Sequence, residues 1–134
     1  MQAISTQKFV RIAPRKLRLI ADMVRGKSVS EVLEALPFVR KDAVKPVEKV
    51  IKSASANAKV KGANPAELVI SKIEISEGPR LKRFRPVSRG QAHGYVRAMS
   101  HIKVVVTTKS EARNPKSEIK TENTKINKKK EGEK

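Results

Sequence analysis

The residues of this sequence best suited to chemistry are cations gathered between Gly78 and Met99. The segment contains six of them, namely Arg80, Lys82, Arg83, Arg85, Arg89 and Arg97. Each could meet a phosphate oxygen, and arginine also offers a planar fork for bidentate contacts and for stacking on bases. From Gly78 to Ser110 there are 8 Lys or Arg and no acidic residue. Solvated surfaces usually mix both signs, so the segment predicts a binding surface for a polyanion rather than a flexible basic loop.

The rest of the chain carries the same sign of charge. Its 134 residues include 31 Lys or Arg and 13 Asp or Glu, a net charge of +18 that a compact fold tolerates poorly without a polyanion. A second group of candidate cations surrounds the first predicted helix: Lys8, Arg11, Arg15, Lys16, Arg18 and Arg25. A solvated helix face is the plain alternative for this group, but the net charge favours phosphate contact.

Other chemistries lack the residues they need. There is no cysteine, which excludes a disulfide framework and a thiolate metal site. His93 and His101 have no paired acidic ligand nearby, so we expect no metal, and no nucleophile elbow or glycine-rich phosphate loop suggests an enzyme or a cofactor. No run approaches the roughly 18 apolar residues of a membrane span, and no signal peptide is evident. We therefore expect a cytoplasmic protein without a membrane partner.

Strands and helices that could position these cations follow from the apolar spacing. The pattern predicts a single α+β domain over residues 1–109, with strands at Gln2–Ile12, Leu68–Glu77 and His101–Lys109. A first helix begins at Pro14, buries Leu17, Ile20, Ala21 and Val24, and ends at Gly26. In the second strand, Val69, Ile73 and Ile75 are expected to share one face.

Two further helices are predicted from their start and stop signals. Ser28 and Glu31 form a capping-box pattern for a short helix that Pro37 ends. A longer helix is expected from Asp42, as its N-cap, to Lys61, with a slight irregularity at Pro46.

The basic segment is expected to form a protruding β-hairpin. The strands on either side of it should pair antiparallel, and the 22 residues from Gly78 to Met99 lie between them. If both strands continue, each arm of about 11 residues reaches roughly 35 Å, with the turn near Ser88–Gln91. Such a hairpin has no core of its own, so a partner must hold it. Phe84 and Tyr95 could stack on nucleobases or pack on each other. Residues 110–134 are expected to form a basic disordered tail.

Several runs of the sequence resemble a known family. They are Glu77–Pro86, Arg89-Gly90, Ser100–Ile102 followed by three valines, Pro14–Arg18, Arg25–Lys27, Ser53-Ala54 and Asn57-Ala58. Over about residues 2 to 109 the chain resembles the bacterial form of large-subunit ribosomal protein family twenty-two. At Val87 and Gln91, and near Gly94 and Ala98, that family often has basic residues, so the hairpin here is less basic than the family pattern.

The resemblance implies a fold and a set of partners. The fold would be a three-stranded antiparallel sheet packed with three helices, with a long hairpin reaching through ribosomal RNA. It adds Lys27 and Lys103 to the RNA-binding candidates, together with His101, which begins a strand and is expected to contact backbone or RNA. Partners would be large-subunit rRNA, neighbouring ribosomal proteins and the nascent peptide, without homo-oligomers. The hairpin would line the exit tunnel with Leu81, Lys82, Arg83, Arg85, Ser88, Arg89, Gly90, Gln91 and His93. In that family, changes in the segment matching Leu81 to Arg83 loosen macrolide action, and the hairpin tip takes part in peptide-dependent stalling.

Two other classes of protein remain open at this point. An architectural DNA-binding protein with minor-groove β-arms would also combine basic arms with a small αβ body. The order of arm and helices, and the absence of an obvious dimerisation face, favour the ribosomal alternative. A nucleic-acid-modifying enzyme is the third possibility, and no motif supports it.

Overall fold

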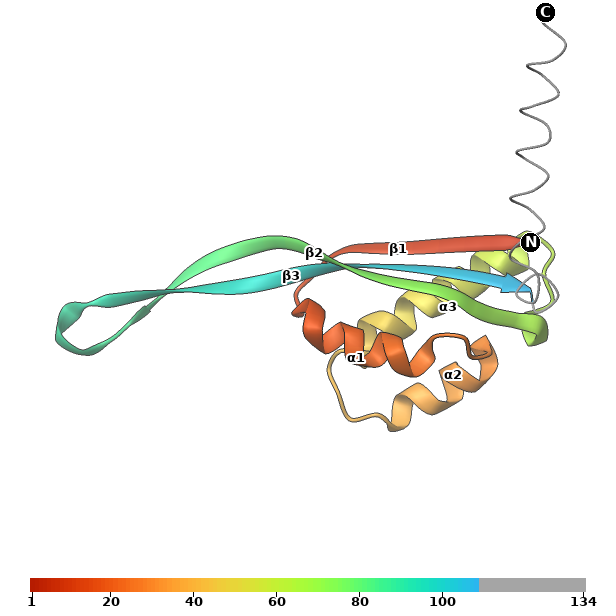
Figure 1. The fold of residues 1–134 in the computed structure, drawn as a ribbon, viewed down its shortest axis with the longest axis horizontal. Coiled ribbons are helices and arrows are strands. Elements are labelled where there is room, and N and C mark those ends of the chain that lie inside the picture. Colours follow the sequence, from red (N-terminus) through yellow and green to blue (C-terminus); the bar gives the residue numbers. More distant parts are fainter. Residues whose placement is uncertain (109–134) are drawn as a thin grey trace, which may run out of the picture.

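A computed structural model of the chain describes residues 1–108, so the predicted tail lies outside the described residues. The elements, in chain order, are β1 (Gln2–Val10), α1 (Pro14–Val24), α2 (Val29–Ala35), α3 (Val44–Val60), β2 (Leu68–Pro86) and β3 (Ala92–Thr108). Short 3-10 turns lie at Leu36–Phe38, Pro65–Glu67 and Ser88–Gly90. The strands form one antiparallel sheet in the order β1-β3-β2, with the helices on one of its faces (Figure 1). The predicted α+β fold, with its three helices, three strands and long hairpin, is confirmed.

The hydrophobic core lies between the helices and the sheet face that they cover. All four predicted apolar positions of α1 are buried, and they meet Val47, Ile51 and Ala54 of α3 within the same apolar cluster. From the sheet, β3 contributes Ile102, Val104 and Val106, each 0% exposed. Each such side chain contributes about 1.5–3 kcal/mol when it leaves water. None of the helices within residues 1–108 is both long and apolar enough to cross a bilayer.

The helix ends follow local signals in two helices but not in the third. Gly26 follows α1 with a φ of +77°, and the Ser28 hydroxyl caps α2 by accepting from the Glu31 N–H at 3.3 Å. The prediction that Asp42 caps α3 is wrong, because the helix begins at Val44 and its N-cap is Ala43. Pro46 is therefore the third helical residue, where its missing N–H removes no intrahelical bond, and α3 continues through it.

A β-bulge at Ser71 changes which side chains of β2 reach the core. The register of β2 against β3 shifts between Ile70 and Lys72. As a result Ile70 and Ile73 both face the helices, at 0% and 4% exposure, and Val69 turns to the opposite face. The prediction that Val69 shares a face with Ile73 is wrong, since strict alternation does not survive a bulge.

Both outer edges of the sheet are covered within the body. At the β2 edge the Gly26 N–H donates to the Ile70 carbonyl, and the Ile70 N–H donates to the Lys27 carbonyl, both at 3.0 Å. At the β1 edge, Asn57 of α3 donates to the Ile4 carbonyl at 3.0 Å. Unpaired strand edges invite pairing with other chains. These contacts cover part of each edge of the body, and β2 and β3 extend beyond it.

Candidate nucleic-acid interface

Beyond β1, the strands β2 and β3 continue as a two-stranded arm. Their pairing runs from Arg80 opposite Ala98 to Pro86 opposite Ala92. The predicted turn is confirmed, with Arg89 and Gly90 at φ of +59° and +71° and the Val87 N–H donating to the Gln91 carbonyl at 2.8 Å. The twisted ribbon extends well past the helices (Figure 1). Every residue from 82 to 97 is exposed, so the arm has no core beneath it.

The register gives the arm two different faces. Arg83 lies opposite Tyr95, and Arg85 lies opposite His93. Directly paired side chains point to the same face of a sheet, so cations and rings alternate on this face. Leu81 and Arg97, also a pair, belong to it as well. The arrangement suits contacts to phosphates and bases on one side of the arm.

The two aromatic rings of the arm do not pack on each other. Phe84 lies opposite Gly94, on the other face from Tyr95, and its ring is 3.8 Å from the place where a Cβ on Gly94 would be. Tyr95 instead has the Arg97 guanidinium 5.9 Å from its ring centroid. Phe84 is 76% exposed and Tyr95 is 42% exposed. Of the two possibilities left open by the sequence, mutual packing is excluded, and both rings are free to stack on another molecule.

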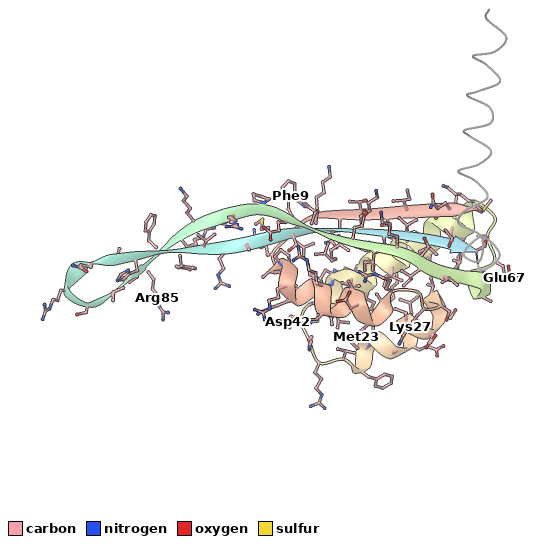
Figure 2. All side chains as sticks on the ribbon, in the orientation of Figure 1. Phe9, Met23, Lys27, Asp42, Glu67 and Arg85 are labelled. Carbon is pink, nitrogen blue, oxygen red and sulfur yellow. The ribbon has the colours of Figure 1, made fainter. Side chains whose placement is uncertain are left out.

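Most cations of the arm have no acidic partner in the described part of the chain. Arg80 is the exception, with its Nη2 3.3 Å from Glu77 Oε2 at the root of the arm. Arg83 donates only to the carbonyl of Lys82, at 3.1 Å. Figure 2 shows side chains projecting from both sides of the arm, with Arg85 labelled on its outer part. Apart from Arg80, the cations of the arm therefore have no compensating carboxylate among residues 1–108.

His101 has a structural contact at the root of the arm. Its Nδ1 accepts from the Phe9 N–H at 3.0 Å, and the two rings meet edge to face at 5.0 Å. The Nδ1 atom must be unprotonated to accept, so the proton of the neutral ring is on Nε2. Gly78 makes room for the ring, because a Cβ there would lie 3.3 Å from the imidazole. Of the two contacts expected for His101, the one to backbone is present, and an RNA contact by His101 stays a prediction.

The candidates on α1 point to solvent as predicted. Arg15, Lys16, Arg18 and Arg25 are exposed around the buried stripe, and Lys27 is exposed just beyond the helix. One of them is paired, since Arg25 Nη1 lies 3.1 Å from Asp22. Exposed pairs of this kind contribute little and compete weakly with a polyanion.

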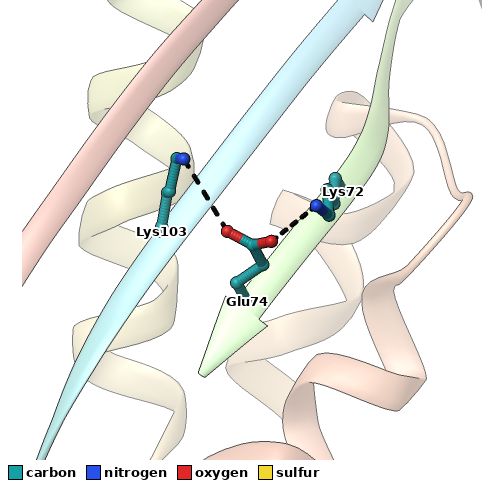
Figure 3. Close-up of polar contacts among 3 residues, drawn as sticks. All are labelled: Lys72, Glu74 and Lys103. Atoms are coloured by element: carbon teal, nitrogen blue, oxygen red, sulfur yellow. Dashed lines mark ion pairs between the residues drawn. The ribbon is translucent and has the colours of Figure 1, made fainter. Parts of the chain in front are cut away.

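Lys8 and Lys103 belong to the sheet face that the helices leave open. Lys103 Nζ is 3.7 Å from one oxygen of Glu74, and Lys72 Nζ is 2.6 Å from the other (Figure 3). The hydrogen bond from Lys72, aided by its charge, lowers the pKa of Glu74 below its usual value. Both pairs are exposed, so they compete only weakly with a polyanion for Lys103.

The fold also gathers cations that sequence reasoning did not select. Arg11 and Arg97, far apart in sequence, border one cleft at the root of the arm. The loop before α3 brings Arg40 and Lys41 to it, and the first turn of α3 brings Lys45. These three residues are not part of an acid-free run or of a recognisable motif, so only the tertiary structure reveals them. Within residues 1–108 no three His, Asp or Glu side chains form a metal-binding group.

A small α+β body with exposed cations that continue onto an arm without a core is typical of the class of proteins that bind a polyanion by charge and shape. The family profile described as ribosomal protein L22p/L17e matches residues 5–107. A large ribosomal subunit protein uL22 from Pediococcus pentosaceus is 50% identical over 110 residues, which cover 81% of this chain and 93% of that protein. Its counterpart from Oceanobacillus iheyensis is 49% identical over 112 residues, 83% of this chain and 99% of that protein. The chain belongs to the ribosomal protein L22p/L17e family, whose members are structural components and not enzymes.

Proposed function

We propose that the chain is a structural constituent of the large ribosomal subunit that binds large-subunit rRNA and aids its assembly. The arm carries this proposal, because residues 82–97 are all exposed and most of the arm's cations lack a carboxylate partner among the described residues. A two-stranded hairpin is at best marginally stable alone in water. RNA phosphates on both sides of the arm would neutralise its cations and hold it in place. Both relatives are named as proteins of the large ribosomal subunit, which agrees with an RNA environment.

The arm is proposed to lie along the nascent-peptide exit tunnel. The residues that would line it are Leu81, Lys82, Arg83, Arg85, Ser88, Arg89, Gly90, Gln91 and His93. Its contacts would be with rRNA, with neighbouring ribosomal proteins and with the nascent peptide, and the chain would act in the cytoplasm as a single copy. An extended two-stranded arm without a core is narrower than a packed domain, and this supports the proposed position.

The proposed RNA contacts fall into three groups. The arm supplies Arg80, Lys82, Arg83, Arg85, Arg89 and Arg97. The body supplies Lys8, Arg11, Arg15, Lys16, Arg18, Arg25, Lys27, His101 and Lys103. Most of these are exposed arginines and lysines, so positioning by phosphate contact would dominate over the reading of bases.

Neutralising two arginines of the arm tests the proposal. In the full chain carrying Arg83→Gln and Arg85→Gln, we expect weaker binding to large-subunit rRNA. The slope of log K against log salt should become less steep by about 1.4, since each lost phosphate contact accounts for about 0.7 on single strands. The midpoint of thermal unfolding of the free protein should not change, because both side chains lie outside the core.

A matched pair on α3 serves as the control. Lys49→Gln with Lys59→Gln removes the same charge from two exposed positions outside the proposed contacts. The proposal fails if the arm pair and the control pair give the same slope, or if the wild-type chain binds duplex DNA as tightly as rRNA at equal salt. If Arg83→Gln with Arg85→Gln lowers the midpoint of thermal unfolding of the free protein, the arm belongs to the folded core.

A further inference from the structure

A broad cleft separates the root of the arm from the helices. Its volume is about 1170 Å³, and its walls come from three places in the chain: residues 11–19, residues 37–48 and residues 96–98. Asp42, labelled in Figure 2, lies on the loop that forms the wall opposite the arm. The cleft exceeds the roughly 300–1,000 Å³ of most small-molecule pockets, so its size suits a stretch of polymer better than a metabolite.

Cationic side chains dominate the rim of this cleft. They are Arg11, Lys16, Arg40, Lys41, Lys45 and Arg97, and none of them makes an ion pair among residues 1–108. Two carboxylates also line it, Asp42 and Glu48. Glu48 is already paired with Lys52 at 2.7 Å. Even with Asp42 counted against the six cations, the rim keeps a strong positive excess among the described residues.

The N-terminal ends of α1 and α3 add to the positive potential of the cleft. The first residues of α1 and of α3 both border the cleft, and neither N-cap, Ala13 or Ala43, has a side chain that accepts from the helix. Neither first turn contains an acidic residue, and lysines stand there instead, Lys16 in α1 and Lys45 in α3. A cation beside the positive end of a helix dipole is unfavourable, and an anion in the cleft would reverse that effect.

We propose that the cleft holds the sugar-phosphate backbone of one RNA strand, with Arg40, Lys41 and Lys45 as contacts beyond those inferred from sequence. This rests on the proposed function, that the chain binds rRNA. RNA is favoured over an acidic protein segment because Arg97 belongs both to the cleft and to the cationic face of the arm. A single polyanion can therefore pass from one to the other. The apolar wall formed by Ile12, Leu19 and Val96 offers packing for a ribose or a base edge.

The first test removes charge from the cleft without touching the arm. In the full chain, Lys41→Gln with Lys45→Gln should make the salt slope of binding to large-subunit rRNA less steep by about 1.4. The control is again Lys49→Gln with Lys59→Gln, which takes the same two charges from exposed positions outside the cleft and should leave the slope unchanged. A cleft pair that behaves as the control pair does overturns the cleft proposal.

The second test locates the RNA directly and does not depend on lowering affinity. The chain has no cysteine, so Asp42→Cys provides a single attachment point for a photo-crosslinker in the cleft, and Ala56→Cys provides one on the exposed side of α3. In the assembled large subunit, position 42 should crosslink to a short, defined stretch of rRNA, and position 56 should not crosslink to that stretch. Crosslinking of position 42 to a neighbouring protein, or to nothing, overturns the proposal.

The tests separate this inference from the proposed function. If the arm pair Arg83→Gln and Arg85→Gln changes the slope but the cleft pair does not, the cleft fails and the function stands. If the wild-type chain shows neither a steep slope nor a preference for rRNA, the proposed function fails and the cleft proposal fails with it.

Discussion

At the scale of single residues, side-chain contacts at the root of the arm connect β3 to β1 and to the chain before α1. Phe9 has a φ of +58°, in the left-handed region that costs a residue with a side chain about 1–3 kcal/mol. The bond from its N–H to His101 Nδ1 and the edge-to-face contact of the two rings offset part of that cost. Ser100, fully buried next in the chain, donates its hydroxyl to the Ile12 carbonyl and connects β3 to the start of α1.

Replacing His101 tests this role. His101→Ala should lower the free energy of unfolding by about 1 kcal/mol, because the Phe9 N–H loses its acceptor and the ring contact disappears. Urea denaturation of the free protein measures the change. The matched control is His93→Ala, whose side chain is exposed on the arm and should leave stability unaltered. Equal effects of the two replacements would contradict a structural role for His101.

At the scale of elements, the bulge in β2 decides which side chains stabilise the body. By leaving Ser71 out of the ladder, it lets Ile70 and Ile73 reach the core from positions three apart. The unbulged strand would have buried Val69 and Ser71 instead. Further along the same strand, a second shift between Glu77 and Arg80 marks the place where β2 leaves the body and becomes one side of the arm.

Truncation of two neighbouring residues distinguishes the bulged strand from a regular one. Ile70→Ala should cost about 2–5 kcal/mol, as expected for a fully buried aliphatic side chain. Val69→Ala, on the open face, should cost less than about 1 kcal/mol. Thermal or urea denaturation of both variants would show the difference. A larger loss for Val69→Ala would mean that the register of β2 is not the one described.

At the scale of the whole molecule, a modest core supports a large excess of positive charge. The net charge of +18 repels itself in the free protein, and the apolar cluster between sheet and helices must overcome that repulsion. The arm lowers the repulsion within the body by placing cations at a distance from it. The same cations then lie on a hairpin that has no hydrophobic core beneath it. A bound polyanion would neutralise the repelling charges and would also make stabilising contacts along the hairpin.

Salt should therefore stabilise the free protein. Raising KCl from about 0.05 M to about 0.5 M shortens the Debye length to below about 5 Å and screens the repulsion. We expect the midpoint of thermal unfolding to rise. In a variant with Lys49→Glu and Lys59→Glu the rise should be smaller, because less repulsion remains to be screened. An unfolding midpoint that falls with KCl would show that specific ion pairs, and not the net charge, control stability.

The sequence alone determined those features whose causes are local. The stripe of α1 and its stop at Gly26 depend on residues within one or two turns of each other, and the turn at Ser88–Gly90 depends on adjacent residues. The basic arm was equally visible, since a run without acids between two apolar strands needs no tertiary information. These features carried most of the proposed function.

Only the tertiary structure decided what depends on residues far apart in the chain. The bulges near Phe9 and Ser71 arise from pairing with β3, and no local pattern records them. The same is true of the cleft, whose cations come from three separated segments and meet only when α1 and α3 pack beneath the sheet. Charge along a sequence predicts that a polyanion is bound, but the directions in which packed elements point their side chains determine where it can lie.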